Sequence, residues 1–206
     1  MKAAEIKSIL VKELKFDIQD IKKLELFEEQ LLLYNKKYNL ISKSTENEIW
    51  NRHILDSAQL VKFIDFNLPH SLSDMGSGAG FPGLVLSIFN KNNRFHVKLY
   101  EKSKVKCDFL KNIINNLNIQ CRIYDNDYHS HNIDSNYIVS RAFKKLPELM
   151  RISREIASKP HKLIVLKGKS AQEEVNKLPK EWNYKYRLEV SLTNKDSRVL
   201  IVNINK

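Results

Sequence analysis

The ten residues from Asp74 to Gly83 read Asp-Met-Gly-Ser-Gly-Ala-Gly-Phe-Pro-Gly and hold four of the five glycines in this 206-residue chain. A backbone with so few side chains lets a ligand approach it closely. The segment 71–75 before the glycines predicts a short strand, and the apolar run 84–89 predicts a helix that Pro82 opens. The free amides at the start of such a helix can face the polar groups of a ligand. This pattern of strand, glycine turn and helix predicts a site for a nucleotide-like ligand.

Two cofactors compete for this loop, and Asp74 separates them. Residues 78–83 fit the Gly-x-Gly-x-x-Gly fingerprint of dinucleotide sites, whereas residues 74–80 fit the acid-x-Gly-x-Gly-x-Gly loop of S-adenosylmethionine enzymes. A carboxylate is unfavourable beside two phosphates but suits a cationic methyl donor, whose methionine part it would help to hold. Glu101 ends the next predicted strand, where it would accept hydrogen bonds from ribose hydroxyls. The residues favour S-adenosylmethionine and leave NAD as the alternative.

His53 and Asp56 form a second candidate pair, three residues apart in a predicted helix. At that spacing they can bond each other or a neighbouring backbone group as well as serve a site. Cys107 and Cys121 stand in contexts without the signature of a nucleophile, and the six histidines do not form a metal-binding set. The chain shows no pairing of a nucleophile with a base, which favours a reaction driven by alignment of the reactants.

The formal net charge of +11 favours a polyanionic partner. Basic residues are dense between residues 141 and 169, against Glu148 and Glu155 only. The nine are Arg141, Lys144, Lys145, Arg151, Arg154, Lys159, Lys162, Lys167 and Lys169. This segment predicts contact with nucleic acid. Lys102, Lys104, Lys106 and Lys111 could add a second RNA-facing ridge, or could be solvated lysines on an outer helix.

The periodicity of apolar residues predicts the elements that position these groups. Residues 1–62 read as helices, with Asp17 as the cap of the second and Thr45 to Glu48 as a capping box for the third. Residues 63–206 read as a doubly wound α/β sheet whose last two strands form an antiparallel pair. The strands are expected at 71–75, 96–101, 119–124, 137–140, 163–166, 184–192 and 199–204, with helices at 84–89, 104–117 and 146–158. The sequence therefore predicts one α/β domain with a helical N-terminal extension packed on its core.

Two further expectations concern the setting of the protein. No signal peptide is visible, and no apolar run approaches the about 20 residues that a membrane span requires. We therefore expect a cytoplasmic protein without membrane contact, and a monomer in the absence of any sign of an oligomer.

Several motifs in order identify a family resemblance. The glycine loop is preceded by Tyr38-Asn39-Leu40-Ile41 and Arg52-His53-Ile54-Leu55-Asp56-Ser57, and is followed by Ser140-Arg141-Ala142-Phe143 and Leu166-Lys167-Gly168. Together they resemble the small-subunit ribosomal RNA guanine-N7 methyltransferase family, also called glucose-inhibited division protein B, nearly end to end. The resemblance implies a class I S-adenosylmethionine-dependent methyltransferase fold, Rossmann-like with an antiparallel last strand. It also implies methylation of N7 of one guanine in the 530 loop of 16S ribosomal RNA, as naked RNA or in a small-subunit precursor.

The resemblance also implies the site residues. Donor-binding residues would be Asp74, Gly76, Gly78, Phe81, Glu101, Asn126, Asp127 and Arg141. Asn126 departs from the alanine or valine that the family more often has before the acid, although a main-chain contact there would survive. Arg141 and Lys167 would hold the phosphate or base of the target nucleotide, and His53, Asp56 and Asn39 would close the pocket. In the opposing interpretation Arg141 pairs with an acid and Lys167 is solvated.

The expected chemistry agrees with the lack of a nucleophile–base pair and of an amino-methyltransferase loop in the sequence. Guanine N7 presents an unprotonated lone pair, so attack on a sulfonium methyl group needs alignment and a suitable electrostatic setting but no general base. Amino-group methyltransferases commonly carry an Asn/Asp-Pro-Pro-aromatic loop where this chain has residues 140–143. Two other functions remain open, an NAD-dependent oxidoreductase and an inactive, RNA-binding protein of methyltransferase type.

Overall fold

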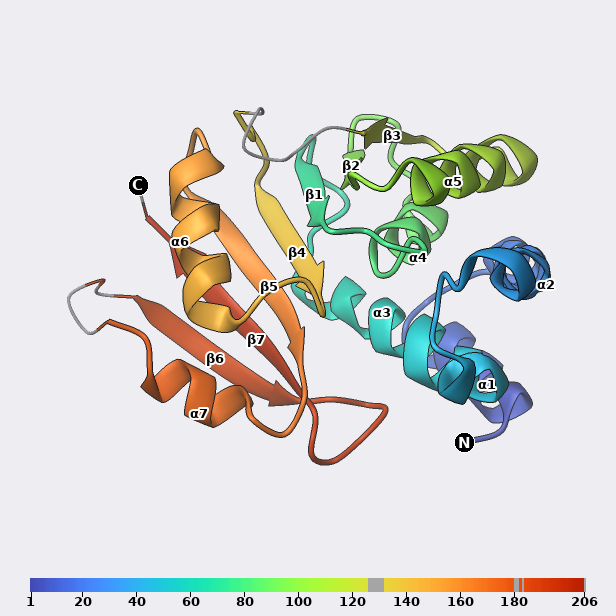
Figure 1. The fold of residues 1–206 in the computed structure, drawn as a ribbon, viewed down its shortest axis with the longest axis horizontal. Helices are drawn as coiled ribbons and strands as arrows, with labels where there is room; N and C mark the ends of the chain where they lie inside the picture. The colour runs from blue at the N-terminus through green and yellow to red at the C-terminus, as the bar shows by residue number, and fades with distance from the viewer. Residues whose placement is uncertain (126–131, 180–181, 183, 206) are drawn as a thin grey trace.

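The computed structural model describes residues 1–125, 132–179, 182 and 184–205. Within them a seven-stranded sheet has the order β3-β2-β1-β4-β5-β7-β6 and carries helices on both faces (Figure 1). The first five strands of that order are parallel, and β7 runs antiparallel between β5 and β6. The strands are β1 (Ser71–Met75), β2 (His96–Tyr100), β3 (Cys121–Tyr124), β4 (Tyr137–Arg141), β5 (His161–Lys167), β6 (Lys185–Val190) and β7 (Arg198–Ile204). The predicted doubly wound sheet with a terminal antiparallel pair is confirmed.

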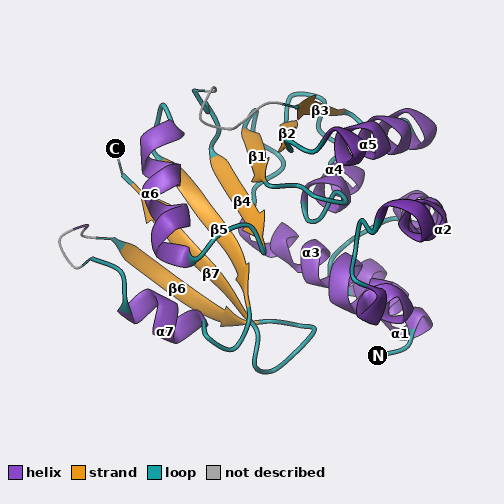
Figure 2. Cartoon of the chain, viewed as in Figure 1, coloured by secondary structure: helices purple, strands orange, loops and turns teal. Residues whose placement is uncertain are grey.

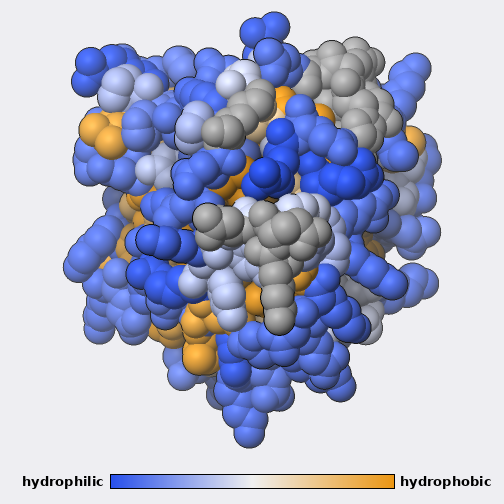
Figure 3. Space-filling model, turned by 90° about the vertical axis from the view of Figure 1, so that its left-hand side faces the viewer, coloured by the Kyte–Doolittle hydropathy of each residue, from blue (hydrophilic) through white to orange (hydrophobic). Residues whose placement is uncertain are grey.

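The helices fall into two groups, one on each side of the sheet (Figure 2). One group comprises α1 (Ala3–Lys12), α2 (Ile18–Tyr38), α3 (Asp56–Ala58), α4 (Gly83–Phe89) and α5 (Lys104–Leu117). The other comprises α6 (Leu146–Ile156) and α7 (Ala171–Asn176). Figure 3, which views the molecule from the side of α6 and α7, shows mostly hydrophilic residues with small apolar areas between them.

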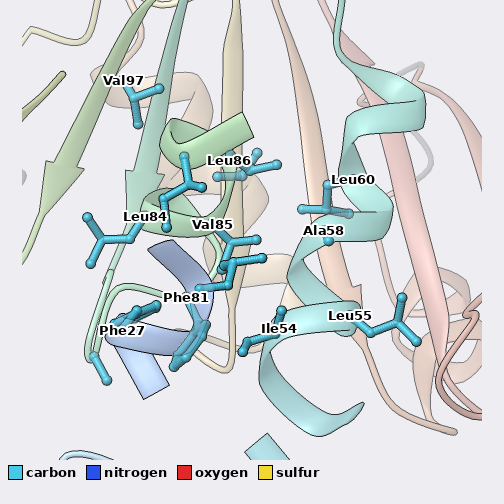
Figure 4. Close-up of a cluster of buried hydrophobic side chains, with 14 of the residues drawn as sticks. Phe27, Ile54, Leu55, Ala58, Leu60, Phe81, Leu84, Val85, Leu86 and Val97 are labelled. Carbon is cyan, nitrogen blue, oxygen red and sulfur yellow. The ribbon is translucent and has the colours of Figure 1, made fainter. Parts of the chain in front are cut away.

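Alternate residues of the strands belong to two different hydrophobic cores, because successive side chains of a strand point to opposite faces of its sheet. In β5, Ile164 and Leu166 pack with the first group of helices, whereas Leu163 and Val165 pack with α6 and α7. The first core also includes residues of α1 and α2, so the N-terminal helices share it with the sheet. Figure 4 shows Phe27 of α2 beside Phe81 of the glycine loop, with Leu84, Val85 and Leu86 of α4 close by.

The third N-terminal helix differs from its prediction. Residues 43–63 form a series of short turns: a 3₁₀ segment η1 (Lys43–Glu48), a π-helical segment η2 (Trp50–Leu55), α3, and a second 3₁₀ segment η3 (Gln59–Phe63). The predicted capping box at Thr45 is wrong, because the Thr45 hydroxyl lies inside η1 and donates to the Ser42 carbonyl. Ile49, which directly precedes the π-helical segment, is buried in the first core.

The other predicted elements are present within a few residues of the expected bounds. Asp17 caps α2 as predicted, since its side chain accepts a hydrogen bond from the Asp20 amide. The strand order reverses at β1, which lies between β2 and β4. Ligands of open α/β sheets bind at the carboxyl ends of the strands beside such a reversal, and the glycine loop leaves β1 there. A search of the described helices finds none long and apolar enough to cross a bilayer.

Candidate functional site

The loop from Gly76 to Pro82 turns on glycines in the left-handed region. Gly76 has a φ of 72° and Gly78 a φ of 58°, a region that is costly for residues with a Cβ. At Gly76 an added Cβ would lie 2.3 Å from Cδ2 of Phe143, so this glycine lets the loop and the segment after β4 touch. At Gly78 the nearest atom, the Gly76 carbonyl oxygen, would be 3.9 Å away. The backbone at Gly78 is thus open to a ligand, as a cofactor loop requires.

Asp74 lies beneath this loop and is fully buried. Its Oδ2 accepts a hydrogen bond of 2.9 Å from the Gly83 amide at the start of α4, while Oδ1 has no hydrogen-bond partner among the described residues. Burial raises the pKa of Asp74 to about 7, against the lowering effect of the Gly83 amide. A cation bound beside the loop would favour the ionised form of this acid, so the site fits a sulfonium cofactor better than a pyrophosphate.

Glu101 follows β2 and faces the same loop. Its Oε2 accepts a hydrogen bond of 2.9 Å from the Gly78 amide, and its Oε1 accepts one of 2.8 Å from the Ser103 amide. Each carboxylate oxygen has two lone pairs, so both can still accept from a ligand hydroxyl. The structure therefore places the acid predicted for the ribose against the glycine loop, and that role stays a prediction.

A cavity of about 400 Å³ opens at the carboxyl ends of β4 and β5, next to the loop. Its lining joins the two strand ends to the N-terminal helices and to the segment between β6 and β7. It includes Thr45, Arg52, His53, Asp56, Ser140, Arg141, Phe143, Lys144, Lys167, Gly168 and Thr193. Four of the five residues predicted to handle the target nucleotide meet here: Arg141, Lys167, His53 and Asp56. Cations outnumber the one carboxylate in this lining, which suits an anionic ligand.

Phe81 supports two of these residues from below. Its ring lies 5.0 Å from that of His53 in a stacked arrangement, and the Arg141 guanidinium lies 5.1 Å from the ring centroid. Phe27 packs on the same ring at 5.1 Å (Figure 4). Because Phe81 is only 2% exposed, its ring packs under His53 and Arg141 and does not border open solvent. The loop motif did not indicate this supporting role.

His53 is held in its neutral form. Burial, together with the charges of Arg141 and Arg52, lowers the pKa of His53 to about 3. Its Nε2 lies 2.9 Å from the Thr45 hydroxyl, and Nδ1 has no partner among the described residues. The histidine therefore adds no positive charge to the cavity at neutral pH.

Asp56 is fixed through one oxygen. Oδ1 accepts hydrogen bonds from Gln59 at 2.9 Å and from Thr193 at 3.2 Å. All its side-chain hydrogen bonds to described residues use Oδ1, which leaves Oδ2 as an acceptor for a ligand. Burial raises the pKa of Asp56, while Arg141 acts in the opposite direction. The considered His53–Asp56 bond is not made, because each side chain has other partners.

Arg141 and Lys167 lie on the two neighbouring strands, as predicted, and both are anchored. One Arg141 guanidinium nitrogen donates to the Arg52 carbonyl at 3.0 Å, and Arg141 forms no ion pair with an acid of the described chain. Lys167 makes an ion pair of 2.8 Å with Glu174 and donates to the Lys144 carbonyl at 3.2 Å. The solvated lysine of the opposing interpretation is wrong, since the side chain of Lys167 is 11% exposed.

One residue predicted to close the pocket, Asn39, is not part of the cavity lining. Asn39 ends α2 in a left-handed conformation with φ 49°, is exposed, and is absent from the cavity lining. The short polar side chain tolerates that conformation, which gives Asn39 a role in the fold. Asn126 and Asp127 lie outside the described residues.

The basic segment 141–169 does not form one surface. Arg141, Lys144 and Lys167 line the cavity, but Lys159 and Lys162 lie at the opposite end of the parallel strands. Arg151 pairs with Glu155 on α6. Counting charges along the sequence therefore overstated the basic area at the site. The chain leaves one end of the sheet through a helix and re-enters at the other end, so basic residues that are close in sequence lie at opposite ends of the strands.

Two residues that hold the cavity together had no signal in the sequence. Glu174 pairs with Lys167, and Thr193 bonds Asp56 from 137 residues away. Such contacts arise from tertiary packing between segments with no common motif, so spacing rules cannot reveal them.

Comparison with known proteins agrees with this geometry. A profile of the family described as "GidB: rRNA small subunit methyltransferase G" matches residues 20–201. Ribosomal RNA small subunit methyltransferase G of Pelagibacter ubique is 36% identical over 187 residues, which cover 88% of this chain and 86% of that protein. The protein of the same name from Rickettsia felis is 39% identical over 184 residues, or 88% of this chain and 92% of that protein.

Among solved structures, an S-adenosylmethionine-dependent methyltransferase from Aquifex aeolicus superimposes with a TM-score of 0.60 at 12% identity, covering 82% of this chain and 96% of that one. The fold is therefore that of the class I methyltransferases, with added N-terminal helices. With the family profile spanning most of its length, this chain belongs to the GidB family of rRNA small subunit methyltransferases G.

Proposed function

We propose that this S-adenosylmethionine-dependent enzyme methylates N7 of one guanine in the 530 loop of 16S ribosomal RNA. The observation that carries the proposal is the contact between the glycine loop and the cavity. The glycine loop, suited to a cationic methyl donor, touches the wall of a cavity lined by Arg52, Arg141, Lys144 and Lys167 through the packing of Gly76 on Phe143. Donor and nucleic acid would thus meet at the carboxyl ends of β1 and β4.

The donor half would be held by the loop and its two acids. Bound S-adenosylmethionine supplies a methyl group on a positively charged sulfur. Glu101 accepts hydrogen bonds from the ribose, the open backbone at Gly78 permits close approach, and Asp74 fixes the loop through the Gly83 amide. Direct contact with the methionine part would require Asp74 to become accessible, because it is fully buried. We retain Gly76, Phe81, Asn126 and Asp127 as proposed donor-site residues.

The acceptor half would hold the guanine and its phosphate. Arg141 and Lys167 lie on neighbouring strands and present positive charge to the cavity, where they can bind a phosphate or the O6 edge of the base. Guanine carries two adjacent donors on its Watson–Crick edge, the N1–H and the N2 amino group, and Oδ2 of Asp56 can accept from them. Aligned in this way, N7 attacks with its own lone pair, and no side chain must remove a proton first.

A direct assay tests the proposal. The purified protein is incubated with methyl-tritiated S-adenosylmethionine and either 16S RNA or small ribosomal subunits from a strain that lacks the gene, and N7-methylguanine is located by chemical cleavage at the modified base. We expect one labelled position, in the 530 loop. Binding of NAD but not of S-adenosylmethionine would refute the proposal, and donor binding without any RNA methylation would favour the inactive RNA-binding alternative.

A further inference from the structure

Phe143 is an aromatic residue in the cavity lining. It follows β4 after Ala142, whose φ of 51° is unusual for a residue with a side chain. This turn brings the Phe143 ring against Gly76, where only hydrogen occupies the position of a Cβ. The same ring is half-buried and borders the cavity beside Arg141 and Lys144. Phe143 therefore belongs to both halves of the site.

The surroundings of this ring suit a nucleobase. An enzyme that modifies a base in folded RNA must take that base out of its stack, and an aromatic side chain can replace the lost stacking. Cationic side chains next to the ring can bind the phosphates on either side of an extruded base. A purine stacked on Phe143 would also lie beside Gly76, at the edge of the loop that carries the methyl donor.

We propose that the target guanine stacks on Phe143, which thereby sets the position of N7 relative to the donor loop. This inference rests on the proposed function and extends it from the class of substrate to the side chain that positions the base. Stacking of one base on one aromatic ring contributes about 1–3 kcal/mol, which corresponds to an about 5- to 150-fold change in binding or rate. We expect the effect of removing the ring to fall on RNA, because the ring borders the cavity lined by cationic side chains.

Two substitutions separate stacking from simple packing. Phe143→Leu keeps an apolar side chain against Gly76 but removes the ring face, whereas Phe143→Tyr keeps the ring. Phe63→Leu is the matched control, because Phe63 is also half-buried but lies outside the cavity. For each protein we would measure kcat/KM for RNA at saturating donor, the Kd for S-adenosylmethionine, and the Tm.

We expect Phe143→Leu to lower kcat/KM for RNA by about 5- to 150-fold, with the donor Kd and the Tm close to those of the wild type. Phe63→Leu should stay near the wild-type kcat/KM, and Phe143→Tyr should lose less activity than Phe143→Leu because it keeps the ring. Undiminished kcat/KM in Phe143→Leu would overturn the inference. So would tighter donor binding in that variant, which would mean that the ring obstructs the donor site.

A second readout keeps this inference separate from the proposed function. A synthetic RNA hairpin with 2-aminopurine at the target position reports stacking by loss of fluorescence, whether or not methylation follows. We expect quenching with the wild type and Phe143→Tyr, and a clear loss of quenching with Phe143→Leu. Equal quenching by all three proteins would overturn the inference even if methylation is confirmed, whereas absence of methylation by the wild type would count against the proposed function instead.

Discussion

Replacing Asp74 with asparagine should stabilise the free protein at alkaline pH while weakening donor binding. The pKa of Asp74 is about 7 in the fold, against an ordinary value of 3.8. Between these two values the unfolded chain has lost the proton and the folded protein has kept it. Since stability falls with rising pH wherever the unfolded state binds fewer protons, Asp74 makes folding progressively less favourable from about pH 4 to about pH 7.

The size of the effect follows from the two pKa values. One pKa unit corresponds to about 1.4 kcal/mol, so the shift costs about 4 kcal/mol at pH 8 and about 2 kcal/mol at pH 5. Asparagine keeps an oxygen for the Gly83 amide and has no charge to desolvate. The stability gained by replacing aspartate with asparagine should therefore be about 2 kcal/mol greater at pH 8 than at pH 5. Any effect of the substitution on packing that does not depend on pH drops out of this difference.

Urea unfolding of the wild type and Asp74→Asn at pH 5 and pH 8 measures this difference, with Asp108→Asn on the exposed surface of α5 as the control. Calorimetric titration with S-adenosylmethionine at pH 8 should show weaker binding to Asp74→Asn, because the negative charge that suits a sulfonium is gone. Equal stability differences at the two pH values would refute the argument from desolvation. Donor binding that is unchanged in the variant would refute the electrostatic role.

Three further predictions use the same assays. Arg141→Ala should abolish methylation of 16S RNA while urea unfolding stays cooperative, since its guanidinium lies in the cavity and over Phe81; an unchanged methylation rate would contradict its assigned role. Gly83→Ala should lose about 1–3 kcal/mol of unfolding free energy by overpacking, because its Cβ would lie 2.3 Å from Cδ2 of Leu99. Gly78→Ala has open space for a Cβ but a φ of 58°, so it should lose about 1–2 kcal/mol through backbone strain together with donor affinity in calorimetry. Glu174→Gln should weaken RNA methylation by freeing Lys167 from its ion pair, and a rate equal to the wild type would show that the anchoring of this lysine is dispensable.

The parts of this protein that follow local rules could be predicted from its sequence. The helix α5 has the predicted bounds, because its amphipathic pattern marks a helix without help from tertiary structure. The glycine loop was found because close backbone approach demands one residue type. The order of the strands then fixed which strand ends meet, and so brought Arg141 and Lys167 to one cavity.

The parts that depend on packing between distant segments could not be predicted. Asn39 was assigned to the pocket from its motif alone, but the end of α2 holds it away from the cavity lining. Residues 43–63 form 3₁₀, π-helical and α-helical turns in place of one regular helix, and a 3.6-residue period cannot anticipate such a change. Burial of the Phe81 ring under His53 likewise depends on packing of the glycine loop against η2, and neither segment's sequence indicates this contact by itself.

The shared core of the N-terminal helices and the sheet limits how this enzyme can be re-engineered. His53 reaches the cavity from η2, yet its ring is stacked on Phe81 of the donor loop, which in turn packs on Phe27 of α2. A chimera that exchanged the N-terminal helices for those of a relative, in order to change RNA preference, would also replace the surface on which the donor loop rests. Such a graft would have to carry compatible partners for Phe81, so substrate choice and donor binding in this protein cannot be recombined as separate modules.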